Sequence, residues 1–163
     1  MMKLTPEMLF KRLKSLGITI QIHKHAPVFT VEESKIHCGH ILGGHCKNLF
    51  LKDKKGTLYL IITSDEQVID LKALRSQISS HQLSFGKPEL LHKILGVKPG
   101  SVSPFALIND KQRLVKVILD KEMMKMKLLN YHPLTNSMTA TITPTDLLKF
   151  IRDTGHNFSL IEF

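Results

Sequence analysis

Three polar segments interrupt the apolar runs of this 163-residue chain and carry side chains that could do chemistry. They read Gly43-Gly44-His45-Cys46-Lys47-Asn48, Gly96-Val97-Lys98-Pro99-Gly100-Ser101-Val102-Ser103-Pro104-Phe105 and Tyr131-His132-Pro133-Leu134-Thr135-Asn136. Each joins glycine or proline to polar side chains, and each taken singly could be a structural turn. Because all three interrupt apolar strand-like runs, we expect loops that meet at one site.

Lys47 is the first candidate for chemistry, because Lys47 and Asn48 stand directly before the apolar run Leu49 to Leu51. An ammonium group at the start of a buried strand could bind a phosphate or a developing oxyanion at the edge of a pocket. An ordinary surface lysine is the alternative, and the sequence around this position leaves it open.

The loop from Gly100 to Pro104 could present backbone N–H groups to an oxyanion or a carbonyl. Gly100 permits unusual dihedral angles and Pro104 stiffens the exit of the loop. A plain connection between a helix and a strand is the alternative. His132 precedes Pro133, which favours an extended conformation and would fix the ring at the end of a strand, although a lone histidine is often structural.

A cluster of imidazole and thiol groups raises the question of a metal site; its members are His37, Cys38, His40, His45 and Cys46. These groups are zinc ligands, but their spacing fits neither the paired C-x2-C nor the H-x3-5-H pattern of the usual sites. We therefore expect a polar loop beside the active site, with no metal and no cofactor. A covalent role for Cys38 or Cys46 is the less favoured alternative, because no activating partner is evident.

The absence of several motifs and the low aromatic content disfavour other functions. The chain has no G-x-G-x-x-G after a strand, no G-x-x-x-x-G-K-[ST], no H-E-x-x-H and no G-x-S-x-G, which disfavours nucleotide hydrolysis and zinc-protease chemistry. Aromatic residues make up 6% and tryptophan is absent, which disfavours a stacking platform for long single strands. Contact with a short RNA end stays open.

Charge points to a polyanionic partner. The chain carries 23 Lys and Arg against 14 Asp and Glu, a formal net charge of +9, which favours contacts with nucleic-acid phosphates; a basic soluble protein without such a partner is the equally weighted alternative from charge alone. Its 42% hydrophobic and 23% charged residues are typical of a folded domain, so we expect one domain over residues 1–163. No apolar run approaches the roughly 20 residues that span a bilayer, and we expect a cytoplasmic protein with no membrane partner.

Start and stop signals place helices along the chain. We expect them over residues 6–16 after Thr5, from Val31 after a capping box at Thr30, after Asp70, from Pro88 to Gly96, and from Pro144 to Gly155. The helices after Asp70 and Pro88 are expected to cover one side of a sheet.

Alternating apolar residues place the strands. Ile18, Ile20 and Ile22 predict a first strand, and residues 48–51 and 57–62 flank a polar turn and predict a hairpin. Residues 106–108 and 114–119 predict a second hairpin, followed by strands over 139–142 and 158–161. Strand pairs interleaved with single helices predict a mixed α/β (α+β) fold with a curved, mostly antiparallel mixed sheet and flanking helices.

Several long segments, in the same order, resemble the stand-alone prolyl-tRNA editing proteins of the YbaK/prolyl-tRNA-synthetase-associated family. The matching segments run from His25 to Glu33, from Gly43 to Asp53, from Gly100 to Asp110 and from His132 to Asn136. The likeness is greatest to the alanyl-tRNA(Pro) deacylase branch and extends nearly from end to end. Cys46 departs from the threonine expected at its position.

The resemblance implies a YbaK-like editing domain that hydrolyses the ester joining alanine to the terminal adenosine of tRNA(Pro), without a metal. It implies catalytic roles for Lys47, Asn48 and His132. It implies substrate-binding roles for Phe29, Gly100, Ser101, Val102, Ser103, Pro104 and Asn136. With no Ser-His-Asp or Cys-His set evident, water is expected to attack directly, with a substrate ribose hydroxyl as one candidate activator.

Two other functions remain open from the sequence. One is a deacylase for another small aminoacyl-tRNA, Cys-tRNA(Pro) or Ser-tRNA. The volume of the pocket would decide between these substrates and Ala-tRNA(Pro). The other is a non-catalytic module that binds tRNA or a synthetase. The expected partners are the acceptor end of tRNA(Pro) and prolyl-tRNA synthetase, and the expected oligomeric state is a monomer.

Overall fold

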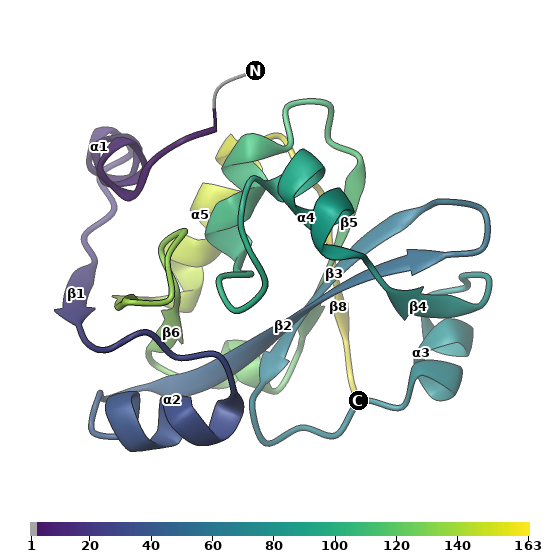
Figure 1. The fold of residues 1–163 in the computed structure, drawn as a ribbon, viewed down its shortest axis with the longest axis horizontal. Helices are drawn as coiled ribbons and strands as arrows, with labels where there is room; N and C mark the ends of the chain where they lie inside the picture. Colours follow the sequence, from purple (N-terminus) through teal and green to yellow (C-terminus); the bar gives the residue numbers. More distant parts are fainter. Residues whose placement is uncertain (1–2) are drawn as a thin grey trace.

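A mixed eight-stranded sheet forms the centre of the protein, whose computed structural model describes residues 3–163 (Figure 1). The strands are β1 (Gln21–Lys24), β2 (Gly44–Asp53), β3 (Leu58–Ser64), β4 (Leu83–Phe85), β5 (Val115–Asp120), β6 (Leu129–Tyr131), β7 (Met138–Ile142) and β8 (Phe158–Ile161). The helices are α1 (Pro6–Ser15), α2 (Val31–Cys38), α3 (Leu71–Gln77), α4 (Pro88–Leu95) and α5 (Pro144–Asp153), with short 3-10 helices η1 (Pro104–Asn109) and η2 (Met123–Lys125).

The strand order is β1-β7-β6-β2-β3-β5-β8, and β4 pairs with β2. Antiparallel ladders join β1 to β7, β7 to β6, β2 to β3 and β2 to β4, while parallel ladders join β6 to β2, β3 to β5 and β5 to β8. The prediction of a mixed α/β fold around a mixed sheet is confirmed.

Capping residues start the helices where the sequence predicts. The Thr30 hydroxyl accepts a hydrogen bond from Glu33 N at 3.1 Å, and the side chains of Thr5, Asp70 and Thr143 cap α1, α3 and α5 in the same way. Gly96 ends α4 in the left-handed conformation. Local side-chain chemistry therefore fixes these boundaries, including the position of α2.

The two faces of the sheet carry different cores, because successive residues of a strand face opposite sides. Leu60 and Ile62 of β3 join the larger cluster, which holds the buried residues of α1, α4 and α5. Tyr59 and Ile61 pack with Leu74 of α3. The expectation that the helices after Asp70 and Pro88 cover the same side is therefore wrong, and Figure 1 shows α3 and α4 well apart.

The second predicted hairpin is also wrong. Residues 104–109 form η1, whose start is fixed by Pro104 and by the Ser103 hydroxyl, which accepts from Phe105 N at 3.2 Å. All six residues of η1 are buried, so the segment shows no alternation that would separate a strand from a helix. Strand β5 instead pairs in parallel with β3 and β8. The first predicted strand is shifted, since Ile18 and Ile20 precede β1.

One edge of β2 is open along part of its length. β3 pairs with residues 46–52, whereas on the opposite edge β6 reaches only residues 44–45 and β4 only residues 51–53. Within residues 3–163, positions 46–50 thus have no strand partner on that edge. Lys47 and Asn48 lie in this open stretch, where a ligand can approach the strand.

No helix within the described part of the chain, residues 3–163, is long and apolar enough to cross a membrane.

Candidate active site

A cavity of about 220 Å³ lies beside the open stretch of β2, and we call it the β2 cavity. Its walls come from four separate parts of the chain: the start of α2, the β2–β3 pair, the loop before η1 and the segment after β6. The lining residues are Val28, Phe29, Thr30, Val31, Ser34, Cys46, Lys47, Asn48, Asp65, Gly100, Val102 and His132. All three segments singled out in the sequence therefore contribute to it.

Lys47 and Asn48 line the β2 cavity from successive positions of the strand. Asn48 lies opposite Ile62 and Lys47 opposite Thr63 in an unbroken antiparallel register, so their side chains leave β2 toward opposite faces. None of the ion pairs within residues 3–163 involves Lys47. Its ammonium group is thus available to an anionic group of a ligand.

The Oδ1 atom of Asn48 is a buried acceptor that has no hydrogen-bond partner within residues 3–163. A buried polar atom in this state costs about 1–3 kcal/mol, so such atoms are rare in native proteins outside functional sites. Because Asn48 lines the β2 cavity, this acceptor is a candidate contact for a ligand or a water.

Gly100 gives the loop before η1 a backbone conformation that residues with a side chain rarely adopt. Its φ is +90°, and a Cβ there would lie 3.3 Å from Phe29 Cδ1 and 3.6 Å from the carbonyl oxygen of Val28. Phe29 is 67% exposed, so it lies over the glycine at the mouth of the cavity. The close approach of the two segments depends on the missing side chain.

His132 is held as a neutral imidazole. Its Nδ1 bonds the carbonyl oxygen of Met138 at 2.9 Å, so Nδ1 carries the proton and Nε2 is left as an acceptor. Burial lowers the pKa of His132 from its ordinary value and outweighs the hydrogen bond to Met138, which raises it, while the nearby His25 lowers it further. The two rings lie 6.1 Å apart, centroid to centroid.

Cys46 lines the β2 cavity as a protonated thiol. Burial raises its pKa to about 12, so the thiolate that a covalent mechanism needs is disfavoured at neutral pH. Cys38 is fully buried against Val28 and Ile41. Within residues 3–163, no three His, Cys, Asp or Glu side chains are grouped as a metal ion would require.

Four residues expected to bind substrate do not line the β2 cavity. Ser101, Ser103 and Pro104 are buried, and the last two form the start of η1. Asn136 donates from Nδ2 to the carbonyl oxygen of Val28 at 2.8 Å. The geometry gives these residues a supporting position, because they hold the segments that carry Gly100 and Phe29.

Sequence reasoning missed other lining residues, including Val31, Ser34 and Asp65. The capping box predicts the start of α2 but contains nothing that places this helix against β2. Asp65 could have been found, because its amide donates to the carbonyl oxygen of His45 at 2.9 Å and so continues the register of the predicted hairpin.

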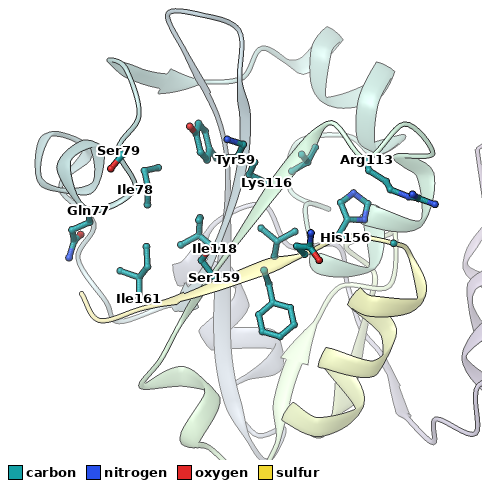
Figure 2. A pocket seen from close by; sticks show the side chains of 15 residues that line it. Tyr59, Gln77, Ile78, Ser79, Arg113, Lys116, Ile118, His156, Ser159 and Ile161 are labelled. Atoms are coloured by element: carbon teal, nitrogen blue, oxygen red, sulfur yellow. The ribbon is translucent and has the colours of Figure 1, made fainter.

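A larger groove of about 750 Å³ lies elsewhere, along β3, β5, β8 and the end of α3, and we call it the β5 groove (Figure 2). It contains none of the site residues expected from the sequence. Its charged groups are Arg113 and Lys116, and no Asp or Glu is among its lining residues. Lys116 Nζ lies 6.0 Å from the centroid of the Tyr59 ring, as part of the wall.

Comparison with known proteins identifies the family. The family model described as "Aminoacyl-tRNA editing domain" matches residues 25–150, a span that contains every residue lining the β2 cavity. The chain belongs to the aminoacyl-tRNA editing domain family. The resemblance stated from the sequence is thus confirmed.

Curated relatives of this editing domain match nearly the whole chain. A prolyl-tRNA editing protein, ProX, of Acetoanaerobium sticklandii is 38% identical over 153 residues, covering 93% of each chain. A prolyl-tRNA synthetase associated domain-containing protein 1 of Danio rerio is also 38% identical over 153 residues, covering 93% of this chain and 83% of the relative.

Solved structures share the fold of the editing domain at lower identity. One, described as a candidate trans-editing enzyme for prolyl tRNA synthetase, has a TM-score of 0.74 at 19% identity and covers 100% of this chain and 99% of its own. The hypothetical protein APE2540 has a TM-score of 0.73 at 16% identity, covering 92% and 95%. At these identities the two structures support the fold alone.

Proposed function

We propose that this editing domain is a trans-acting deacylase that hydrolyses the ester between alanine and tRNA(Pro). The observation that carries the proposal is the β2 cavity, where Lys47, Asn48, Gly100 and His132 meet from distant parts of the chain. The names of the relatives support the prolyl-tRNA part of the proposal, since ProX is described as a prolyl-tRNA editing protein.

The size of the β2 cavity favours a small aminoacyl group. Its volume of about 220 Å³ is below the roughly 300–1,000 Å³ of pockets for drug-sized ligands. A synthetase pocket built for proline rejects a smaller amino acid poorly, because a missing methylene changes binding by only about 1–3 kcal/mol. A second site that admits alanine and excludes proline by size supplies the missing discrimination.

The proposed reaction is direct attack of water on the ester carbonyl. The water oxygen bonds to the carbonyl carbon, the bond from that carbon to the ribose oxygen breaks, and the ribose oxygen takes a proton. Lys47 supplies positive charge to the substrate end, and the backbone at Gly100 supplies N–H donors to the developing oxyanion. Cys46 stays a thiol and forms no covalent intermediate.

The charge of the chain supports RNA as the partner. A formal net charge of +9 favours contact with the phosphates next to the acceptor end of tRNA(Pro). Prolyl-tRNA synthetase is the second proposed partner, as the protein that releases the mischarged tRNA. We further propose that residues 1–163 act as one monomeric domain in the cytoplasm.

A binding assay run beside a deacylation time course tests the proposal. The purified chain should bind tRNA(Pro) in a gel shift and should release alanine from Ala-tRNA(Pro) faster than buffer does. Binding without turnover would replace the enzyme by a tRNA-binding module. Turnover of Cys-tRNA(Pro) or Ser-tRNA in preference to the alanyl substrate would keep the enzyme and change its specificity.

A further inference from the structure

A chamber of about 30 Å³ adjoins the β2 cavity, and we call it the inner chamber. Its lining residues are Ser34, His45, Cys46, Asn48, Asn130, Tyr131, His132 and Thr139. Ser34, Cys46, Asn48 and His132 line both spaces, so these four residues form the border between the chamber and the cavity.

The inner chamber is large enough to hold a water molecule. A cavity needs roughly 10–15 Å³ of probe volume for one water, and a buried water needs two to four polar partners. Whole amino acids and nucleotides are much larger than this space, so a water, or a methyl group reaching in from the cavity, is the guest that it suits.

Most polar side chains of the inner chamber already have partners. Asn130 Nδ2 donates to the carbonyl oxygens of Leu42 and Gly44 at 3.0 and 3.3 Å, and Asn130 Oδ1 accepts from Thr141 Oγ1 at 2.6 Å. His45 Nε2 bonds the carbonyl oxygen of Ile41 at 3.0 Å. These groups fix the walls and are not free to bind a guest.

Two acceptors and the hydroxyl of Ser34 lie on the border and remain for a guest. Asn48 Oδ1 is buried without a partner within residues 3–163, and His132 Nε2 is the ring nitrogen left after Nδ1 bonds Met138. A water can donate one hydrogen to each of them, which satisfies both acceptors at once. A methyl group cannot, since it would leave Asn48 Oδ1 buried and unsatisfied.

We propose that the inner chamber binds one water, which donates to Asn48 Oδ1 and His132 Nε2 and is the water that attacks the ester. The role in attack rests on the proposed deacylase function; the water site itself does not. As the water oxygen bonds to the carbonyl carbon, His132 Nε2 takes one of its protons. When the bond from carbon to the ribose oxygen breaks, that proton passes to the ribose oxygen, so imidazole and thiol end unchanged.

Substitutions at Ser34 test the proposal, because Ser34 lies on the border of the inner chamber. Ser34→Ala and Ser34→Val both remove the hydroxyl, but only valine adds bulk that fills the chamber. A high-resolution crystal structure of the unmodified chain should show one ordered water bonded to Asn48 Oδ1, and the same density should be absent from Ser34→Val. The value of kcat on Ala-tRNA(Pro) should be roughly tenfold lower for Ser34→Val than for Ser34→Ala, with KM similar, because a nucleophile and not a substrate contact is lost.

Each outcome decides one part of the proposal. A dry inner chamber in the unmodified chain overturns the water site. An ordered water together with equal kcat for the two Ser34 variants overturns its role in attack. If the unmodified chain deacylates nothing, the proposed function fails, and the crystal structures still decide whether the water site exists.

Discussion

Two concave regions of this protein, the β5 groove and the β2 cavity, differ in size and in the polar groups that they contain. The β5 groove has about 750 Å³, and it is lined by residues of β3, the end of α3, β5 and the segment from Gly155 to Ile161. The β2 cavity has about 220 Å³, and four separate segments meet in it around an open strand edge. The smaller region holds the buried unsatisfied acceptor and the neutral histidine. A buried unsatisfied acceptor and a histidine with a lowered pKa, more than volume, therefore mark the candidate active site.

Of the substitutions that compare the two regions, Lys47→Ala in the β2 cavity should lower the deacylation rate most. Lys47→Ala should lower kcat/KM on Ala-tRNA(Pro) by about 100-fold or more, because losing the charge that positions the substrate end misplaces the ester, and a misplacement of about 1 Å can cost that much. Lys52→Ala is the matched control, since Lys52 lies on the same strand, is exposed and is remote from the cavity. Equal activity of the two variants, measured as initial deacylation rates, would remove Lys47 from the mechanism.

Gly100→Ala should cause the next largest loss. The substitution costs about 1–2 kcal/mol of stability for its positive φ and also presses a methyl group against Phe29 at the mouth of the cavity. Gly56→Ala is a control with φ +87° and nothing within 4 Å of the added Cβ, so it should cost similar stability and leave deacylation intact. Thermal unfolding and kcat/KM, measured on both, should show roughly tenfold lower kcat/KM for Gly100→Ala alone. If Gly56→Ala lowered kcat/KM to the same extent, the lower activity of Gly100→Ala would come from its reduced stability and not from a change at the cavity.

The state of His132 should appear in the pH profile. Since burial lowers the pKa of His132, the ring stays neutral at pH values where an exposed histidine, with a pKa of about 6.5, is already protonated. Deacylation should therefore stay constant as the pH falls through 6.5 and decline only below it, and the decline should vanish from the profile of His132→Asn. An acid limb centred above 6.5 would contradict the assignment.

Cys46→Ala should have a small effect. A thiol with a pKa of about 12 is not the nucleophile, so kcat should change by no more than about threefold, through packing of the cavity wall. Alkylation of the unmodified chain at neutral pH should likewise be slow at this cysteine, as mass spectrometry can measure. A loss comparable with that of Lys47→Ala would restore covalent catalysis.

Arg113→Ala should have the smallest effect on chemistry. Arg113 lines the β5 groove and is not among the residues that line the β2 cavity. The value of kcat at saturating Ala-tRNA(Pro) should match that of the unmodified chain. A fall in kcat as large as that of Gly100→Ala would mean that the two regions act together.

Much of the scaffold is readable from the sequence because its signals are local. Thr30 and Asp70 place their helices through side-chain hydrogen bonds within the same turn, and the polar turn after Asp53 sets the register that puts Lys47 opposite Thr63. The positions of Lys47 before an apolar run and of His132 before Pro133 made both residues candidates, the resemblance to the editing family implied catalytic roles for them, and the structure places both at one cavity.

The features that the sequence does not predict depend on contacts between distant segments. The buried run of η1 has no periodicity that distinguishes helix from strand, and the three-residue strands β4 and β6 are too short to show alternation. Ser34 reaches the site only because the fold brings α2 to the wall of the β2 cavity, a long-range arrangement with no local signal. For the same reason the open edge of β2 and the unsatisfied Asn48 Oδ1 become visible only in the folded structure.

The most direct test of the central claim is the rate at which the unmodified chain hydrolyses Ala-tRNA(Pro), Cys-tRNA(Pro) and Pro-tRNA(Pro) under identical conditions. The account predicts fast release of alanine and little or no release of proline, because the proposed editing site selects its substrate by size. Equal rates for alanine and proline, or no hydrolysis of any of the three, would contradict it.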